Sequence, residues 1–149
     1  KAFNLAGVRF AIAHIGPQWV RDRIATLPDH LLGATNIIGS LAAATAWRHG
    51  GEWLDAGVTR LDGNRRLLAD LLAEHLPDVR YTPPAATYLG WLDCRVLGWG
   101  DDPTVEFARR GVRLSEGPNF GVEGHGFARL NFATSPDVLR QIVERMATQ

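Results

Sequence analysis

Lysine is almost absent from this sequence of 149 residues: of its 16 basic residues, only Lys1 is a lysine and the rest are arginines. There is a single cysteine, Cys94, which excludes an internal disulfide framework. The formal net charge is zero, which argues against a nucleic-acid-binding surface. No apolar run reaches the roughly 20 residues of a membrane-spanning helix. Because no signal-peptide pattern is present, we expect a soluble cytoplasmic protein.

The scarcity of lysine makes the amine of Lys1 a candidate for chemistry. A lysine with a lowered pKa can form a Schiff base with a carbonyl compound, whereas arginine stays protonated and its planar guanidinium suits a phosphate or a carboxylate. Arg9 follows Lys1 after a short glycine-bearing segment. The pair can therefore hold a carbonyl cofactor and its phosphate. Alternatively, Lys1 is a solvated residue and Arg9 is a surface charge.

The first nine residues carry a resemblance that bears on these alternatives. Their pattern, Lys-x-Phe-x-Leu-x-Gly-Val-Arg, resembles the signature around the cofactor lysine of the fold-type I, pyridoxal-phosphate-dependent class I/II aminotransferases. Asn4, where many aminotransferases have glycine, makes the chain most similar to their C–S lyase branch, the MalY/PatB-type cystathionine β-lyases. Ala11, where many aminotransferases also have glycine, tells against an ordinary aminotransferase. The resemblance implies that Lys1 is the Schiff-base lysine of pyridoxal 5'-phosphate and that Arg9 contacts the cofactor phosphate.

A second candidate arginine lies near the end of the chain. On the predicted strand over residues 127–134, Arg129 shares a face with Asn131, while the intervening positions are apolar. An arginine held in this way is well placed for bidentate binding of a carboxylate, and an ion pair with Asp93 or Glu123 is the alternative. The motif Arg-Leu-Asn-Phe-Ala that begins at Arg129 resembles a C-terminal motif of the same family. The resemblance implies that Arg129 binds the α-carboxylate of the substrate.

Residues 34–47 carry no charged side chain. A helix that is apolar all round must be buried in a domain core or a subunit interface. The resemblance places this segment near the interface of a homodimer, where Asn36 reaches a cofactor phosphate across the dimer. The alternative for Asn36 is a polar residue near a helix cap.

Apolar periodicity and turn residues predict an α/β fold. The predicted elements are a buried strand over 8–15, helices over 17–28, 34–47, 52–76, 102–111 and 136–146, and strands over 79–81, 87–97 and 127–134. The resemblance implies that residues 1–50 form the C-terminal end of the pyridoxal-phosphate-binding large domain. Residues 51–149 are then the small C-terminal domain, an α+β unit with a short antiparallel-rich sheet.

In the resembling family the cofactor lysine lies past the middle of the polypeptide. We therefore expect the 149-residue chain to be the C-terminal part of an enzyme, inactive without its N-terminal part. The implied reaction is β C–S cleavage of a sulfur amino acid to pyruvate, ammonia and a thiol. The alternatives are an aminotransferase and a non-catalytic scaffold or regulatory domain on the same fold.

Two further features of the sequence bear on function. The five histidines show no metal-ligand spacing, so no metal site is predicted. The glycine-rich stretch 117–126 lacks the Gly-Lys-Ser/Thr ending of a phosphate-binding loop and the spacing of a dinucleotide fingerprint. The stretch is either a loop near the substrate or a plain connector between two elements. Cys94 is expected to pack in the core.

Overall fold

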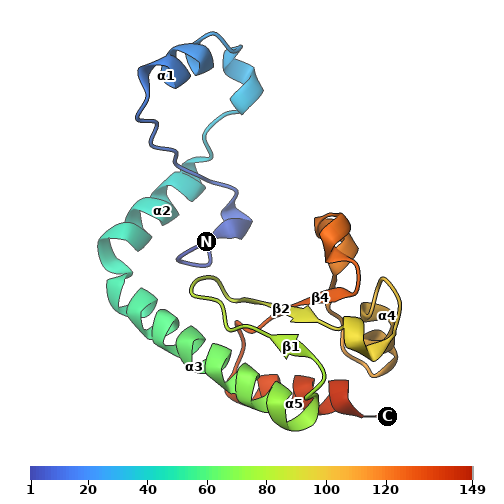
Figure 1. Cartoon of the computed structure of the whole chain (residues 1–149). Coiled ribbons are helices and arrows are strands. Elements are labelled where there is room, and N and C mark those ends of the chain that lie inside the picture. Colours follow the sequence, from blue (N-terminus) through green and yellow to red (C-terminus); the bar gives the residue numbers. More distant parts are fainter. Residues whose placement is uncertain (149) are drawn as a thin grey trace. The chain divides into compact units, whose positions relative to one another are not determined.

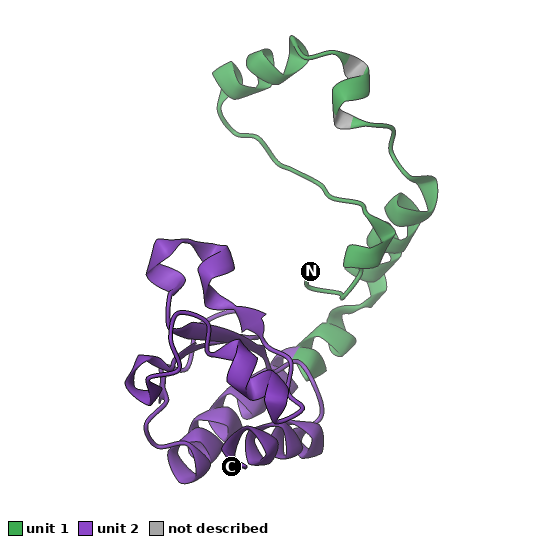
Figure 2. Cartoon of the chain, turned by 90° about the vertical axis from the view of Figure 1, so that its right-hand side faces the viewer, with its two compact units in different colours: residues 1–57 green, residues 58–149 purple. Residues whose placement is uncertain are grey.

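The computed structural model describes residues 1–148, apart from the side chains of Asp29 and Leu32. The chain divides into two compact units, Lys1–Gly57 and Val58–Gln149 (Figure 2). The division falls within helix α3 (Gly51–His75). The domain boundary near residue 51 that the sequence suggests stays a prediction. None of the helices within the described residues combines the length and apolar content that a bilayer crossing requires.

The first unit is built from helices and irregular segments. In chain order it contains η1 (Ala6–Val8), α1 (Gln18–Ala25), η2 (Asp29–Leu32), α2 (Ile37–His49) and the beginning of α3. The helix predicted over residues 17–28 corresponds to α1, with Pro17 as its N-cap residue. The apolar helix predicted over residues 34–47 corresponds to α2.

The prediction of a buried strand over residues 8–15 is wrong for this structure. Residues 9–16 adopt no regular secondary structure, and most of their side chains are exposed, as Ile12 illustrates. A strand requires a neighbouring strand that pairs with its backbone N–H and C=O groups. The described residues of the first unit hold no strand, so residues 8–15 have no partner strand with which to pair.

Helix α2 forms as predicted, but its large apolar side chains are not buried. Ile37 is 82% exposed, Leu41 is 70% exposed and Trp47 is 75% exposed. Of the residues on α2, only Gly39 is buried. These large apolar side chains remain exposed within the described part of the first unit.

The second unit contains a four-stranded antiparallel sheet in the order β1-β2-β4-β3. The strands are β1 (Arg80–Tyr81), β2 (Leu89–Asp93), β3 (Ser115–Glu116) and β4 (Phe127–Asn131). Helix α5 (Pro136–Ala147) and the second half of α3 lie together on one side of the sheet (Figure 1). Shorter helices complete the unit: η3 (Arg95–Leu97), α4 (Thr104–Arg109), η4 (Gly117–Phe120) and η5 (Val122–Gly124). The predicted α/β class, with an antiparallel sheet and flanking helices, is confirmed, whereas β3 was not anticipated.

The core of the second unit lies between the sheet and these helices. Alternate strand residues point into it, so that Leu92, Ala128 and Leu130 are buried while Trp91 and Arg129 lie on the opposite face. Its other main members come from α3, α4 and α5: Leu68, Leu71, Leu72, Phe107, Leu139, Val143 and Met146. Cys94 is buried here, and burial raises the pKa of its thiol to about 12. Cys94 is therefore a packing residue, as expected.

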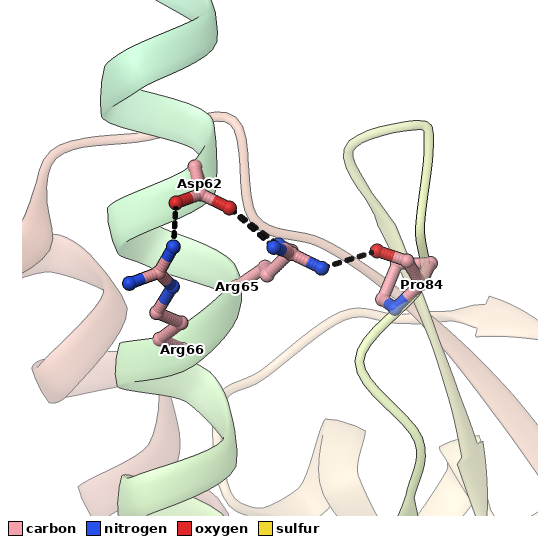
Figure 3. Close-up of polar contacts among 4 residues, drawn as sticks. All are labelled: Asp62, Arg65, Arg66 and Pro84. Carbon is pink, nitrogen blue, oxygen red and sulfur yellow. Dashed lines mark hydrogen bonds and ion pairs between the residues drawn. The ribbon is translucent and has the colours of Figure 1, made fainter.

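Two polar side chains of α3 fasten neighbouring segments of the second unit. Asn64, which is 1% exposed, donates from its Nδ2 to the carbonyl oxygens of Phe132 at 2.9 Å and Thr134 at 2.8 Å. These bonds attach the end of β4 to α3. Arg65 donates from Nη1 to the carbonyl oxygen of Pro84 at 3.0 Å, which attaches the β1–β2 connection (Figure 3).

The guanidinium of Arg65 is itself held by Asp62. Its Nε donates to Asp62 Oδ1 at 2.8 Å, and Arg66 pairs with the other carboxylate oxygen (Figure 3). The hydrogen bond from Arg65, together with both positive charges, lowers the pKa of Asp62. The carboxylate therefore stays ionised and keeps Arg65 directed at Pro84.

Replacing Asn64 should destabilise the second unit. The Asn64→Leu variant keeps a side chain of similar volume but removes the donors to two carbonyl oxygens. We expect the free energy of unfolding, measured by urea titration, to fall by roughly 2 kcal/mol, since two hydrogen bonds are lost, although the carbonyl oxygen of Phe132 still accepts from the backbone N–H of Thr134 at 2.9 Å. The control is Asn119→Leu, because Asn119 is exposed and donates only to Glu116. Its effect should stay within about 0.5 kcal/mol, and equal losses in the two variants would contradict this role.

Candidate functional site

Two tight turns shape the segment from Lys1 to Arg9. The backbone N–H of Asn4 donates to the carbonyl oxygen of Lys1 at 2.9 Å, and the N–H of Arg9 donates to that of Ala6 at 3.2 Å. Asn4 and Arg9 both adopt left-handed backbone conformations, with φ of 54° and 49°. The side chains of Lys1 and Arg9 are exposed.

The backbone of Asn4 explains why the aminotransferases that this segment resembles can have glycine at this position. A positive φ is readily adopted by glycine and, among the other residues, is best tolerated by asparagine and aspartate. Asn4 and glycine therefore meet the same backbone requirement. The resemblance to the C–S lyase branch must consequently rest on more than this one residue.

The residues on either side of Arg9 contact the first turn of α2. The carbonyl oxygen of Val8 accepts a hydrogen bond from Asn36 Nδ2 at 3.0 Å. A Cβ atom on Gly39 would lie 2.8 Å from Phe10 Cβ and 3.0 Å from the Val8 carbonyl oxygen, so only glycine lets the segment pass. Arg9 thus joins two residues that contact the helix N-terminus, where the helix dipole favours a bound anion.

Asn36 is the N-cap residue of α2. Its Oδ1 accepts from the backbone N–H groups of Ile38 at 3.0 Å and Gly39 at 3.2 Å. The capping alternative is therefore confirmed. Its Nδ2 has two hydrogens, one of which is donated to Val8, and the other is available to a ligand. Contact of Asn36 with a cofactor phosphate stays a prediction.

Arg129 lies on β4, on the sheet face opposite the core. It stands across from Trp91 of β2 and Ser115 of β3 in the strand register. Its Nη2 donates to Ser115 Oγ at 3.1 Å, and its Cζ lies 4.4 Å from the centre of the Phe120 ring. Among the described residues, no carboxylate pairs with it, so the alternative of an ion pair with Asp93 or Glu123 does not hold.

Asp93 is paired with a different arginine. Arg95 donates from Nε to Asp93 Oδ1 at 2.9 Å and from Nη2 to Oδ2 at 2.7 Å. The hydrogen bonds from Arg95 lower the pKa of Asp93 and keep it ionised. This two-pronged contact satisfies the carboxylate, so the guanidinium of Arg129 keeps its remaining N–H groups for a ligand.

Aromatic rings surround this face of the sheet. Trp91 stacks on Phe127 with 5.5 Å between ring centres, and it meets the edge of Phe120 at 5.6 Å and 85°. Trp91 therefore packs against both rings. Sequence reasoning missed Ser115 and Phe120 as neighbours of Arg129. Phe120 lies inside the glycine-rich stretch 117–126, which was the available signal.

The candidate residues divide between the two units. Lys1, Arg9 and Asn36 belong to the first unit, and Val8 links the last two. Arg129 belongs to the second unit. A common site for all four stays a prediction. Among the described residues, no group of three or more potential ligands could hold a metal ion.

Comparison with known proteins identifies the family. The model of the aminotransferase class I and II family matches residues 1–146. A predicted cystathionine beta-lyase of Mycobacterium tuberculosis is 39% identical over 165 aligned positions, which cover 99% of this chain and 40% of the relative. Cystathionine beta-lyase PatB of Bacillus subtilis is 34% identical over 149 positions, covering 95% of this chain and 38% of that protein.

A solved structure shows the same fold. The crystal structure of cystalysin from Treponema denticola, which contains pyridoxal 5'-phosphate, matches with a TM-score of 0.90 and 28% identity, over 98% of this chain and 38% of that one. The chain spans at most 40% of the length of the curated relatives it matches. The resemblance inferred from the first nine residues is confirmed. The chain belongs to the class I and II aminotransferase family.

Proposed function

We propose that the protein containing this chain is a pyridoxal-phosphate-dependent β C–S lyase of the cystathionine β-lyase type. It cleaves the Cβ–S bond of a sulfur amino acid to give pyruvate, ammonia and a thiol. The observation that carries this proposal is the 34% identity to cystathionine beta-lyase PatB over 95% of the chain. An aminotransferase reaction on the same scaffold is the alternative, since the family model includes those enzymes.

The residues of the first unit suit the cofactor chemically. Lys1 supplies the only lysine side-chain amine of the chain, and an amine is what an aldehyde requires. Arg9 supplies a guanidinium, and its neighbours Val8 and Phe10 contact the first turn of α2, a setting that suits a phosphate dianion. Asn36 supplies one further N–H. When bound, pyridoxal 5'-phosphate provides the electron sink that stabilises negative charge at the substrate Cα.

Lys1 and Arg129 then have two different roles, removal of a proton and binding of the substrate carboxylate. The amine of Lys1 would hold the cofactor aldehyde and, when free, would remove the Cα proton of the substrate as a general base. The guanidinium of Arg129 binds the substrate carboxylate through two N–H groups. Fixing the carboxylate orients the Cα–H bond toward the base, which lowers the entropic part of the barrier.

Replacing Lys1 tests both the cofactor assignment and the reaction. In the complete protein, Lys1→Arg keeps the positive charge but removes the nucleophilic amine. After borohydride reduction, mass spectrometry should find the cofactor attached to Lys1 in the wild type and absent from the variant. Pyruvate release from L-cystathionine should fall by more than about a hundredfold, the usual size of a lost general base.

Two results with the wild-type protein would contradict the lyase proposal. Transfer of the amino group to an added keto acid, without release of pyruvate, would assign an aminotransferase. Absence of any modification on Lys1 would favour a non-catalytic scaffold. The 149-residue chain, assayed alone as a further control, should release no pyruvate.

Replacing Arg129 tests carboxylate binding. In the complete protein, Arg129→Gln should lower kcat/KM for L-cystathionine by about a hundredfold, because two charge-assisted hydrogen bonds are lost. Attachment of the cofactor to Lys1 should be unchanged. The matched control is Arg140→Gln, since Arg140 is an exposed arginine on α5. A similar kcat/KM in the two variants would exclude Arg129 from substrate binding.

We also propose that the apolar face of α2 is covered by a second copy of the protein in a homodimer. Phe3, Leu41 and Trp53 are among the residues that line a groove of about 440 Å³ along α2, and the lining is almost entirely apolar. Side chains as exposed as Ile37 and Trp47 are costly to leave in water. A contiguous apolar surface of this kind is typical of an interface between subunits.

Sedimentation of the complete protein tests the homodimer. The wild type should have twice the mass of one polypeptide, and Leu41→Arg should shift it toward the monomer by burying a charge at the interface. The control is Val122→Arg, which places the same charge on an exposed apolar residue of the second unit. A monomeric wild type would refute the proposal.

A further inference from the structure

The guanidinium of Arg129 is contacted on two sides by residues with no assigned role. Ser115 Oγ accepts a hydrogen bond from one terminal nitrogen, at 3.1 Å. The ring of Phe120 covers one face of the guanidinium, with 4.4 Å between Cζ and the ring centre. Ser115 takes only one of the two N–H groups of Nη2, so the other Nη2 N–H and the N–H parallel to it remain without a protein partner among the described residues. A carboxylate binds through such a pair of parallel N–H groups.

Phe120 is brought to this position by a close backbone crossing in the glycine-rich stretch. A Cβ atom on Gly117 would lie 2.1 Å from the carbonyl oxygen of Gly124, and one on Gly124 would lie 2.0 Å from that of Gly117. Only two glycines allow the chain to approach itself so closely. The crossing closes the loop that contains η4 and η5, and Phe120 is the last residue of η4.

The contacts of Phe120 point to a function beyond core packing. Its side chain remains 51% exposed, so burial explains little of its placement. Its ring meets Trp91 edge to face at 5.6 Å, and Trp91 is in turn stacked on Phe127. The ring is therefore supported from the sheet while its face is presented to the cation.

We propose that Phe120 is a positioning residue for Arg129. Its ring attracts the cation and, with Ser115, selects the side-chain rotamer that directs the free N–H pair toward the substrate carboxylate. An arginine side chain otherwise has many rotamers, and restricting them before binding reduces the entropic cost of binding. The glycine-rich stretch 117–126 is thus the support of the carboxylate site. This inference rests on the proposed role of Arg129.

A pair of ligands that differ only by a carboxylate tests the inference. L-Alanine and ethylamine both have an amine, and neither can lose a thiolate. Their dissociation constants are measured by calorimetry with the complete, cofactor-loaded protein. The wild type should bind L-alanine more tightly. Phe120→Leu, which keeps an apolar side chain but loses the aromatic face, should weaken L-alanine binding about tenfold and leave ethylamine binding within about twofold.

Three variants complete the experiment. Phe120→Tyr keeps the aromatic face and should restore L-alanine binding. Val122→Ala, in the same loop at a highly exposed position, should bind both ligands as the wild type does. Ser115→Ala should weaken L-alanine binding by a smaller factor than Phe120→Leu. Equal weakening of both ligands by Phe120→Leu would indicate a merely structural role and overturn the inference, as would no weakening of either.

The wild-type result separates this inference from the proposed function. If the wild type prefers L-alanine and Phe120→Leu keeps that preference in full, only the role of Phe120 fails. If the wild type binds L-alanine and ethylamine equally, Arg129 does not hold a carboxylate, and its proposed role and this inference are both overturned, whereas the lyase proposal is tested separately by pyruvate release.

Discussion

The bonds from Asn64 to the carbonyl oxygens of Phe132 and Thr134 are the constraint on which the second unit depends. They attach the end of β4 to α3 and so fix the strand that contains Arg129. The pairing of β2 with β4 then sets Trp91 directly across from Arg129. A buried amide that supplies two backbone acceptors is costly to replace, because an apolar side chain in its place donates to neither.

Backbone crossings that exclude a Cβ atom shape both candidate sites. At Gly39 the segment containing Arg9 passes over the first turn of α2, and at Gly117 and Gly124 the loop containing Phe120 closes on itself. In each case glycine is required by the space between two backbones. The functional side chain itself, Arg9 or Phe120, lies within or beside the segment that makes the crossing. The glycines therefore determine where the chemically active groups lie.

The electrostatics of the second unit keep Arg129 available to a ligand. Asp93 lies two residues from Trp91 along β2, and both of its carboxylate oxygens accept hydrogen bonds from Arg95. The guanidinium of Arg129 instead contacts a hydroxyl and an aromatic ring, neither of which neutralises its charge. A cation left in this state is suited to bind an anion, as a residue that recognises a carboxylate must be.

Local sequence was sufficient for much of this protein. The helices from α1 to α5, the alternation on β4, the core position of Cys94 and the family resemblance of the first nine residues all followed from periodicity, capping and motif. It wrongly predicted a strand over residues 8–15. It did not predict the two-residue strand β3 or the contacts of Phe120 and Ser115 with Arg129. The reason is physical. Periodicity and caps are properties of neighbours along the chain, so the amino-acid sequence alone determined which segments are helical and which residues are chemically exceptional. Strand pairing and the contacts of the Arg129 guanidinium depend on which distant segments of the chain come together, and only the tertiary structure decided that.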